Sequence, residues 1–200
     1  VDAANNRVGI GVASPSKALH VKSTGAVLRL ETTSTTGSNY IDFNDADENK
    51  AFIGLGSGSD DSLSIWNVKN DTVRIATNNT ERMRIDSSGR LLLGTTTEGQ
   101  ATADDLTIAG SGDVGMTIRS GTSNFGNIYF SDGTSGSDEF RGYVQYNHSN
   151  NSLVFASNAS TALTIDSSQR VLVGHTSSYE VYTTSKVQVL ATDGSAGLSI

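Results

Sequence analysis

The sequence lacks cysteine entirely and contains a single proline, Pro15, among its 200 residues. Without cysteine the chain has no disulfide bonds and no thiol chemistry, and its redox compartment is left undetermined. Aromatic residues make up 6% and hydrophobic residues 36% of the chain, which is lean for a globular core. Because a lean chain can still fold when several copies share one core, we expect an oligomer.

Basic residues are scarce as well, with 14 Lys and Arg against 21 Asp and Glu and a formal net charge of −7. No basic stripe runs along the chain, so we expect no nucleic-acid partner, and the acidic surface disfavours anionic membranes. No apolar run reaches the length of about 18 residues that a transmembrane helix needs. We therefore expect no membrane insertion.

The two ends of the chain carry no recognisable targeting segment. Residues 1–6 have neither the charged region nor the apolar region of a signal peptide, and no initiator methionine is present. Residues 197–200 stop within an apparent strand. We therefore expect the chain to be a piece of a longer protein, so that a signal could lie outside these residues.

What the sequence does contain is an internal repeat. Residues 81–94 return 80 positions later at 161–174, and both copies carry the motif Ile-Asp-Ser-Ser; a third, partial copy lies at 6–11. Internal repetition sets the architecture before any single residue does. We predict the end of a preceding repeat at 1–6, repeat 1 at 7–89, repeat 2 at 90–169 and the start of a truncated third repeat at 170–200.

Most apolar segments alternate with period two. Met83 and Ile85 share one face of such a segment, with arginines opposite, which is typical of a half-buried strand. The same alternation occurs at 18–21, 27–30, 40–43, 63–66, 73–75, 128–130, 143–146 and 186–190. The best helical candidate, 97–105, is weakened by Gly99. The sequence therefore predicts an all-β fold.

Turn residues separate these segments. Asp86-Ser87-Ser88-Gly89 fits a short hairpin in which Gly89 takes a positive φ. Gln169 replaces that glycine in the second copy, and a left-handed conformation is costly for a residue with a Cβ, so we expect the second turn to differ slightly. Longer Gly-, Ser-, Asp- and Asn-rich segments predict exposed loops at 32–38, 44–50, 56–61 and 131–139.

Several motif blocks have a recognisable combination: Glu-Arg-Met-Arg-Ile-Asp-Ser-Ser-Gly at 81–89, Val-Gly-Ile-Gly at 8–11, Pro-Ser-Lys-Ala-Leu-His-Val at 15–21, and the segments 142–148 and 151–155. Together they resemble the shaft repeats of bacteriophage tail fibres. The segment 91–94 departs from the Val-Gly-Ile-Gly form by lacking its first glycine. Many members of that family end in an endosialidase-type self-cleaving chaperone domain, and nothing in these residues resembles it.

The resemblance implies an elongated homotrimer in which three chains wrap around a common axis. It further implies a structural, extracellular virion protein that contacts other tail or virion proteins and presents host-attachment surfaces. The physical reading agrees, because a hairpin with one apolar face cannot bury that face alone, whereas three copies can. The residues expected on inward faces are Val8, Ile10, Met83, Ile85, Leu91, Leu93, Leu163, Ile165, Val171 and Val173.

No pattern of residues points to catalysis, a cofactor or a metal. The acidic cluster 42–49 begins like a calcium loop, but Lys50 stands where an EF-hand needs glycine, so a solvated turn is the better interpretation. Asp132, Asp138 and Glu139 are interpreted in the same way. The histidines His20, His148 and His175 are isolated in sequence, although a trimer axis could bring copies of one of them together around a metal.

We therefore predict a non-enzymatic fibre segment with no catalytic, cofactor-binding or metal-binding residues. The loops 44–50 and 131–139 are the parts most free to touch a host glycan. Aromatic residues could also stack on sugars if exposed, although core or interface positions are favoured for them: Tyr40, Trp66, Tyr143 and Tyr146. Two alternatives stay open, a bacterial surface adhesin or filament module, and a tailspike that depolymerises host polysaccharide and would need a groove with paired carboxylates.

Overall fold

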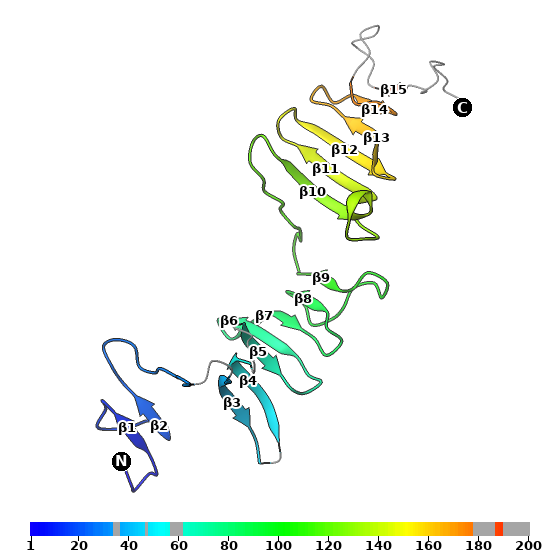
Figure 1. Ribbon diagram of the computed structural model, residues 1–200. Helices are drawn as coiled ribbons and strands as arrows, with labels where there is room; N and C mark the ends of the chain where they lie inside the picture. Colours follow the sequence, from blue (N-terminus) through cyan, green and yellow to red (C-terminus); the bar gives the residue numbers. More distant parts are fainter. Residues whose placement is uncertain (34–36, 47, 57–61, 178–186, 190–200) are drawn as a thin grey trace. The chain divides into compact units, whose positions relative to one another are not determined.

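The computed structural model describes residues 1–33, 37–46, 48–56, 62–177 and 187–189 (Figure 1). Its described part is all-β, with fifteen strands and one short 3₁₀-helix. No helix in that part is long and apolar enough to cross a membrane. The chain divides into two compact units, Val1–Val114 and Gly115–Ile200, and each is described separately.

The first unit contains three small sheets. Strands β1 and β2 form a parallel pair, β3 to β5 an antiparallel sheet, and β6 to β9 a sheet whose last pair is parallel. The strands are β1 (Val8–Ile10), β2 (Leu19–Val21), β3 (Asn39–Asn44), β4 (Asn49–Leu55), β5 (Leu63–Asn67), β6 (Val73–Thr77), β7 (Thr80–Ile85), β8 (Leu91–Leu93) and β9 (Leu106–Ile108).

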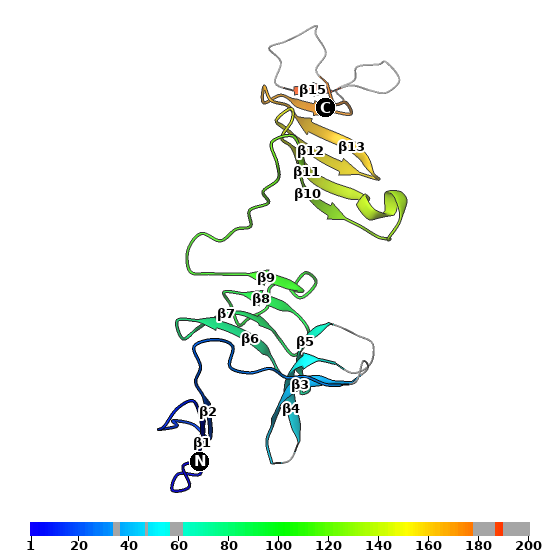
Figure 2. The ribbon, with the colours of Figure 1, turned by 60° about the vertical axis from the view of Figure 1, so that its left-hand side comes forward.

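The second unit contains one six-stranded sheet with its strands in sequence order (Figure 2). All neighbours are antiparallel except the last pair. The strands are β10 (Phe125–Phe130), β11 (Gly142–Asn147), β12 (Ser152–Ser157), β13 (Ser160–Ile165), β14 (Val171–Val173) and β15 (Val187–Val189). The 3₁₀-helix η1 (Gly136–Phe140) lies between β10 and β11.

Strands β6–β9 and β12–β15 are two copies of one module. Val73 pairs with Ile85 as Leu153 pairs with Ile165, and the ladder register shifts at the same place in both copies. Each first hairpin closes with two residues of positive φ, at 50° and 54° in one copy and 52° and 57° in the other. That geometry matches the right-handed twist of the strands, which explains the asparagine at the first turn position of both copies.

The second turn of each module is held by one aspartate. Asp86 accepts hydrogen bonds from the backbone N–H groups of Ser88 and Arg90 at 2.9 and 3.0 Å, and Asp166 makes the equivalent bonds at the same distances. Gln169 takes a φ of 62° where Gly89 has 84°. The second turn therefore differs only slightly from the first, as expected, and Gln169 adopts the left-handed conformation with the same aspartate hydrogen bonds around it.

A glycine of positive φ follows the first strand of each parallel pair. Gly11, Gly94 and Gly174 have φ values of 71°, 73° and 76°. A Cβ on Gly11 would lie 2.2 Å from the carbonyl oxygen of Lys22, and one on Gly94 would lie 2.3 Å from that of Ala109. The glycine therefore lets the chain turn away while the partner strand's backbone passes close by.

Some elements differ from those expected. Residues 27–30 alternate but form no strand, and Leu28 is 64% exposed. Alternation of apolar residues gives a segment one apolar face, but a strand also needs the backbone of a partner strand to bond with. The carbonyl of Leu30 accepts a hydrogen bond from the side chain of Asn39 and not from a partner backbone. Residues 97–105 form no helix, and β9 and η1 were not anticipated, whereas the acidic cluster 42–49 does lie between two strands, β3 and β4. Part of loops 32–38, 44–50 and 56–61, and the ends of 186–190, lie outside the described residues.

Candidate interaction surface

One face of the second unit's sheet is apolar across its strands. Residues that pair across a ladder share a face, and two adjacent rows of such pairs are almost entirely apolar. The first row comprises Tyr146, Leu153, Ile165, Val171 and Val187, and the second Ile128, Val144, Phe155, Leu163 and Val173. We call these two rows, with their counterparts in the first unit, the apolar face.

The first unit repeats this arrangement on β6–β9. Its two rows are Val73, Ile85, Leu91 and Leu106, and Ile75, Met83, Leu93 and Ile108. The small pair β1–β2 does the same with Val8 beside Leu19 and Ile10 beside Val21. The parallel pairs β1–β2, β8–β9 and β14–β15 each contribute aliphatic side chains to one face.

The buried residues lie on the opposite face of each module. Leu92 is 1% exposed and Leu172 is fully buried, and each alternates with the strand neighbours that belong to the apolar face. In the first unit the connection between β8 and β9 crosses this opposite side, since the N–H of Gly99 bonds to the hydroxyl of Thr107 at 2.9 Å. In the first unit this connection therefore covers one face of the module. On the apolar face of the second unit Ile118 packs over Gly126 at one edge, and the row side chains remain exposed or half-buried.

The ten residues predicted to face inward all lie on strands of the apolar face. In the single chain, Val8, Ile10, Ile85 and Val173 are exposed, whereas Met83, Leu91, Leu93, Leu163, Ile165 and Val171 are half-buried. Sequence reasoning missed Leu92 and Leu172, because alternation shows that a strand has two faces but not which of them its own chain covers. Whether the ten residues meet another chain stays a prediction.

Side chains of the apolar face are well exposed in the single chain. Phe155 is 41%, Ile75 51% and Leu106 49% exposed. Contiguous exposed apolar patches on this scale are typical of interaction sites.

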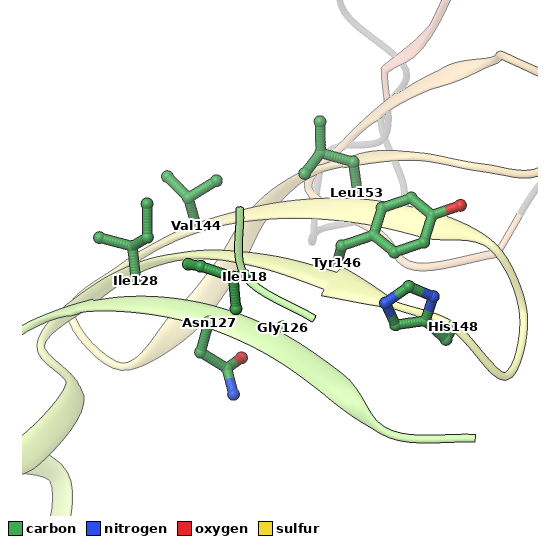
Figure 3. Close-up of a pocket in the computed structure, with 8 residues that line it drawn as sticks. All are labelled: Ile118, Gly126, Asn127, Ile128, Val144, Tyr146, His148 and Leu153. Atoms are coloured by element: carbon green, nitrogen blue, oxygen red, sulfur yellow. The ribbon is translucent and has the colours of Figure 1, made fainter. Parts of the chain in front are cut away.

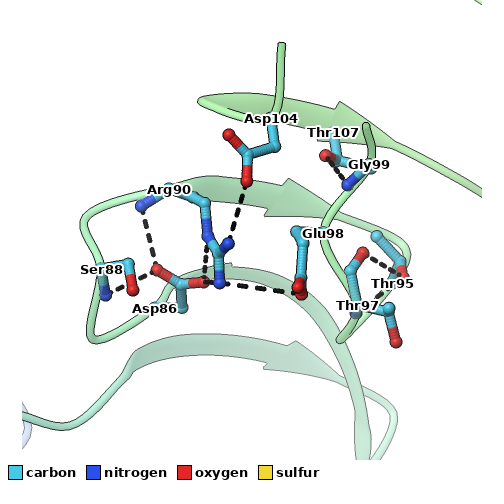
Figure 4. A network of polar contacts seen from close by, with 9 residues as sticks. All are labelled: Asp86, Ser88, Arg90, Thr95, Thr97, Glu98, Gly99, Asp104 and Thr107. Atoms are coloured by element: carbon cyan, nitrogen blue, oxygen red, sulfur yellow. Dashed lines mark hydrogen bonds and ion pairs between the residues drawn. The ribbon is translucent and has the colours of Figure 1, made fainter. Parts of the chain in front are cut away.

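The Asp86 turn anchors an ion-pair network at the edge of this first-unit module (Figure 4). The guanidinium of Arg90 lies 2.7 Å from Asp86 and 3.0 Å from Asp104, with Glu98 at 3.7 Å. The hydrogen bond from Arg90 is the main cause that lowers the pKa of Asp86 below its ordinary value. Arg90 thereby ties the turn to the connection that covers Leu92.

A shallow groove lies on the apolar face of the second unit (Figure 3). Ile118 packs above Gly126, where a side chain at position 126 would meet it at 3.6 Å. The rings of Tyr146 and His148 stand edge to face at the other end, 4.8 Å apart. The lining is mostly aliphatic and aromatic, so the groove suits an apolar side chain better than a charged ligand.

Two carboxylates of the acidic cluster 42–49 are paired with lysines. Lys50 lies 3.0 Å from Asp45 and 2.7 Å from Glu48, and Lys69 also pairs with Glu48. Hydrogen bonds from Lys50 and then Lys69 lower the pKa of Glu48 to about 2. Asp45 and Glu48 are therefore engaged by ammonium groups, and Asp42 accepts a hydrogen bond from the side-chain amide of Asn49 at 3.1 Å. Asp47 lies outside the described residues.

The remaining candidate residues are dispersed. Arg141 pairs with both Asp132 and Asp138. The Nδ1 of His20 accepts a hydrogen bond from the backbone N–H of Ser16 at 3.3 Å, and that of His175 lies 2.5 Å from a backbone carbonyl. In the part of the chain that the structure describes, no three acidic or histidine side chains gather as metal ligands would.

A different aromatic group gathers on β3–β5. Tyr40, Phe52 and Trp66 come from three neighbouring strands, and their rings lie 5.1 Å (Tyr40 to Phe52) and 6.0 Å (Phe52 to Trp66) apart. The sequence singled out Tyr40 and Trp66 but missed Phe52, because nothing in the sequence shows that β4 separates the other two strands. Comparison of the chain with protein-family models and with curated proteins found no match.

Proposed function

We propose that this chain is a structural segment of a trimeric viral fibre that holds and presents host-attachment surfaces. The observation that carries the proposal is the apolar face, which occupies the same ladder positions in both copies of the module. A second chain placed against it would remove from water side chains that the single chain leaves half-exposed, each contributing about 1–3 kcal/mol.

The extent of the apolar face supports an obligate assembly rather than a transient contact. Its rows cross every strand of the module in both copies, and permanent interfaces are more hydrophobic than transient ones. Repetition supports an extended, fibre-like arrangement, since modules that each expose the same face can pair with sister modules one after another. Three chains are proposed because the motif blocks resemble tail-fibre shaft repeats.

The solution mass of the purified chain tests this proposal directly. Sedimentation equilibrium should give three times 20.9 kDa, about 63 kDa, and negative-stain images should show rods. Unheated samples should also resist SDS, because intertwined chains unfold slowly. A compact 20.9 kDa monomer would overturn the proposal, and a dimer would overturn the trimer while keeping the shared apolar face.

A further inference from the structure

The sheet β3–β4–β5 has two faces of different chemistry. One face carries Ile41, Ile53 and Ile65 paired across the three strands. The other face carries a row of Asp42, Phe52 and Trp66, with Tyr40, Gly54 and Ser64 in the row beside it. The aliphatic face resembles the apolar face of the other sheets, whereas the second face combines rings with a carboxylate and a hydroxyl.

The rings on the second face are packed in a fixed order. Phe52 and Trp66 lie nearly parallel, at 8°, and Tyr40 leans on Phe52 from the other side at 40°. Gly54 lies directly across the ladder from Tyr40, and a Cβ there would come within 2.6 Å of the Tyr40 Cβ. The glycine therefore leaves Tyr40 free to lie against Phe52.

The indole of Trp66 stays accessible in this arrangement. Trp66 lies on β5, which is the last strand of its sheet among the described residues. Phe52 stacks on the side nearer β4, and the side chain of Trp66 is nevertheless 57% exposed. Tyr40 is 41% exposed at the opposite end of the group.

We propose that Tyr40, Phe52 and Trp66 form a binding site for a neutral saccharide. The C–H face of a pyranose ring is apolar and slightly positive, and it fits the negative face of an aromatic ring. The carboxylate of Asp42 lies in the same row as the rings, and the side-chain amide of Asn49 donates a hydrogen bond to its Oδ1 at 3.1 Å. Its Oδ2 would accept a hydrogen bond from a sugar hydroxyl and fix the orientation, as a few polar groups do in other small-molecule sites.

Charge favours a neutral sugar over an acidic one. The chain carries a net charge of −7, and Asp42 stands within the site, so an anionic saccharide would be repelled. The neighbouring ammonium groups of Lys50 and Lys69 are already paired with Glu48. A carboxylate amid the rings also argues against a second copy as occupant, since the cores of subunit interfaces are depleted of charge.

The biological role of this site rests on the proposed function, since a fibre would present this surface to a host. Its residues lie outside the rows that define the apolar face, so the two ideas fail separately. A trimer that binds no sugar contradicts only the saccharide site. A monomer that binds sugar contradicts only the fibre.

Trp66 is the sole tryptophan of the chain, so its fluorescence reports on this site alone. The full chain would be titrated with cellohexaose, maltohexaose, mannohexaose and N-acetylchitohexaose, with oligogalacturonate as the anionic comparison. At least one neutral sugar should shift the emission saturably and reduce quenching by acrylamide, while the anionic sugar should not. No response to any neutral sugar up to about 10 mM would overturn the proposal.

Variants compared by calorimetry separate the site from general effects. Tyr40→Ala and Asp42→Asn should each weaken binding about tenfold. If Tyr40→Ala impairs folding, Asp42→Asn still tests the site, because it leaves the packing of the rings unchanged. Tyr129→Ala is the matched control, because Tyr129 is a 51% exposed tyrosine of the other unit, and it should bind like the original chain. If acrylamide cannot quench Trp66 without sugar, a neighbouring copy covers the ring and the proposal is wrong.

Discussion

At the scale of single residues, glycines of positive φ are required for two different reasons in this chain. Gly89 and Gly94 both have a positive φ, at 84° and 73°. A Cβ on Gly89 would meet nothing within 4 Å, whereas one on Gly94 would strike the backbone of Ala109. The first glycine relieves conformational strain alone, and Gln169 shows that the equivalent position accepts a side chain. The second makes the parallel pair β8–β9 possible.

Replacing these glycines should therefore give unequal losses of stability. Gly89→Ala should lower the free energy of unfolding by about 1 kcal/mol, the strain of a left-handed residue. Gly94→Ala should lower it by about 3 kcal/mol or more, because the backbone of β9 must also move. Thermal or urea denaturation of the two variants would measure the difference. Equal losses would mean that the close approach of Ala109 adds nothing.

At the scale of elements, the Asp86 turn is a charged clasp repeated in each module. Its carboxylate binds two backbone N–H groups and the guanidinium of Arg90, and Asp166 does the same with Arg170. In the first unit Arg90 also reaches Asp104, at the end of the connection that covers Leu92. The clasp therefore links a tight turn to the burial of the module's core leucine.

The clasp should make stability depend on pH in acid. The folded-state pKa of Asp86 lies below the ordinary value of 3.8, chiefly through the Arg90 hydrogen bond. Its stabilisation is thus fully present above pH 3.8 and is lost as the pH falls through the lowered pKa. Asp86→Asn, which keeps an acceptor oxygen but no charge, should melt lower than the original chain at pH 7.

The difference between the two melting temperatures should shrink as the pH falls below that lowered pKa. Differential scanning calorimetry between pH 7 and acid would follow it. Asp113→Asn, at an exposed position outside the turns, serves as the control and should track the original chain throughout. A difference in melting temperature between Asp86→Asn and the original chain that stays constant with pH would show that the charge of Asp86 contributes nothing to stability.

At the scale of the whole molecule, the chain buries too little of its own apolar surface. In the described part, Leu92, Val154 and Leu172 are the buried hydrophobic residues, although two full modules are present. Most of the other aliphatic side chains of the two modules lie in the rows of the apolar face, where they are exposed or half-buried. The proposed assembly supplies the missing cover, and a charge placed in the middle of a row tests it.

Phe155→Lys should dissociate the proposed trimer. Phe155 is 41% exposed in the single chain and lies between Val144 and Leu163 in its row, so the single chain tolerates a lysine that a buried interface would not. Sedimentation should show the mass falling toward 20.9 kDa. Ala162→Lys, at an exposed position that alternates with Leu163 on the neighbouring strand and so faces the other side of the sheet, should leave the mass unchanged. If both variants keep the original mass, the row is not an interface.

Local patterns in the sequence were sufficient for the fold class, the repeat and the Asp86 turn. Alternation of Met83 and Ile85 within their strand, and the Asp-Ser-Ser motif after it, act over a few neighbouring residues and can be recognised without knowing the partners. Trp66 and Tyr40 were likewise visible as candidates. These features depend on backbone geometry and turn chemistry, which the adjacent residues determine by themselves.

Only the tertiary structure decided which face each strand's own chain covers. The leucine run 91–93 reads as uniformly apolar, yet Leu92 is buried and its neighbours form the apolar face. It also decided that residues 27–30 lack a partner strand and that Phe52 joins Tyr40 and Trp66. These outcomes depend on pairings between distant segments, whose free energy comes from contacts that no local pattern encodes.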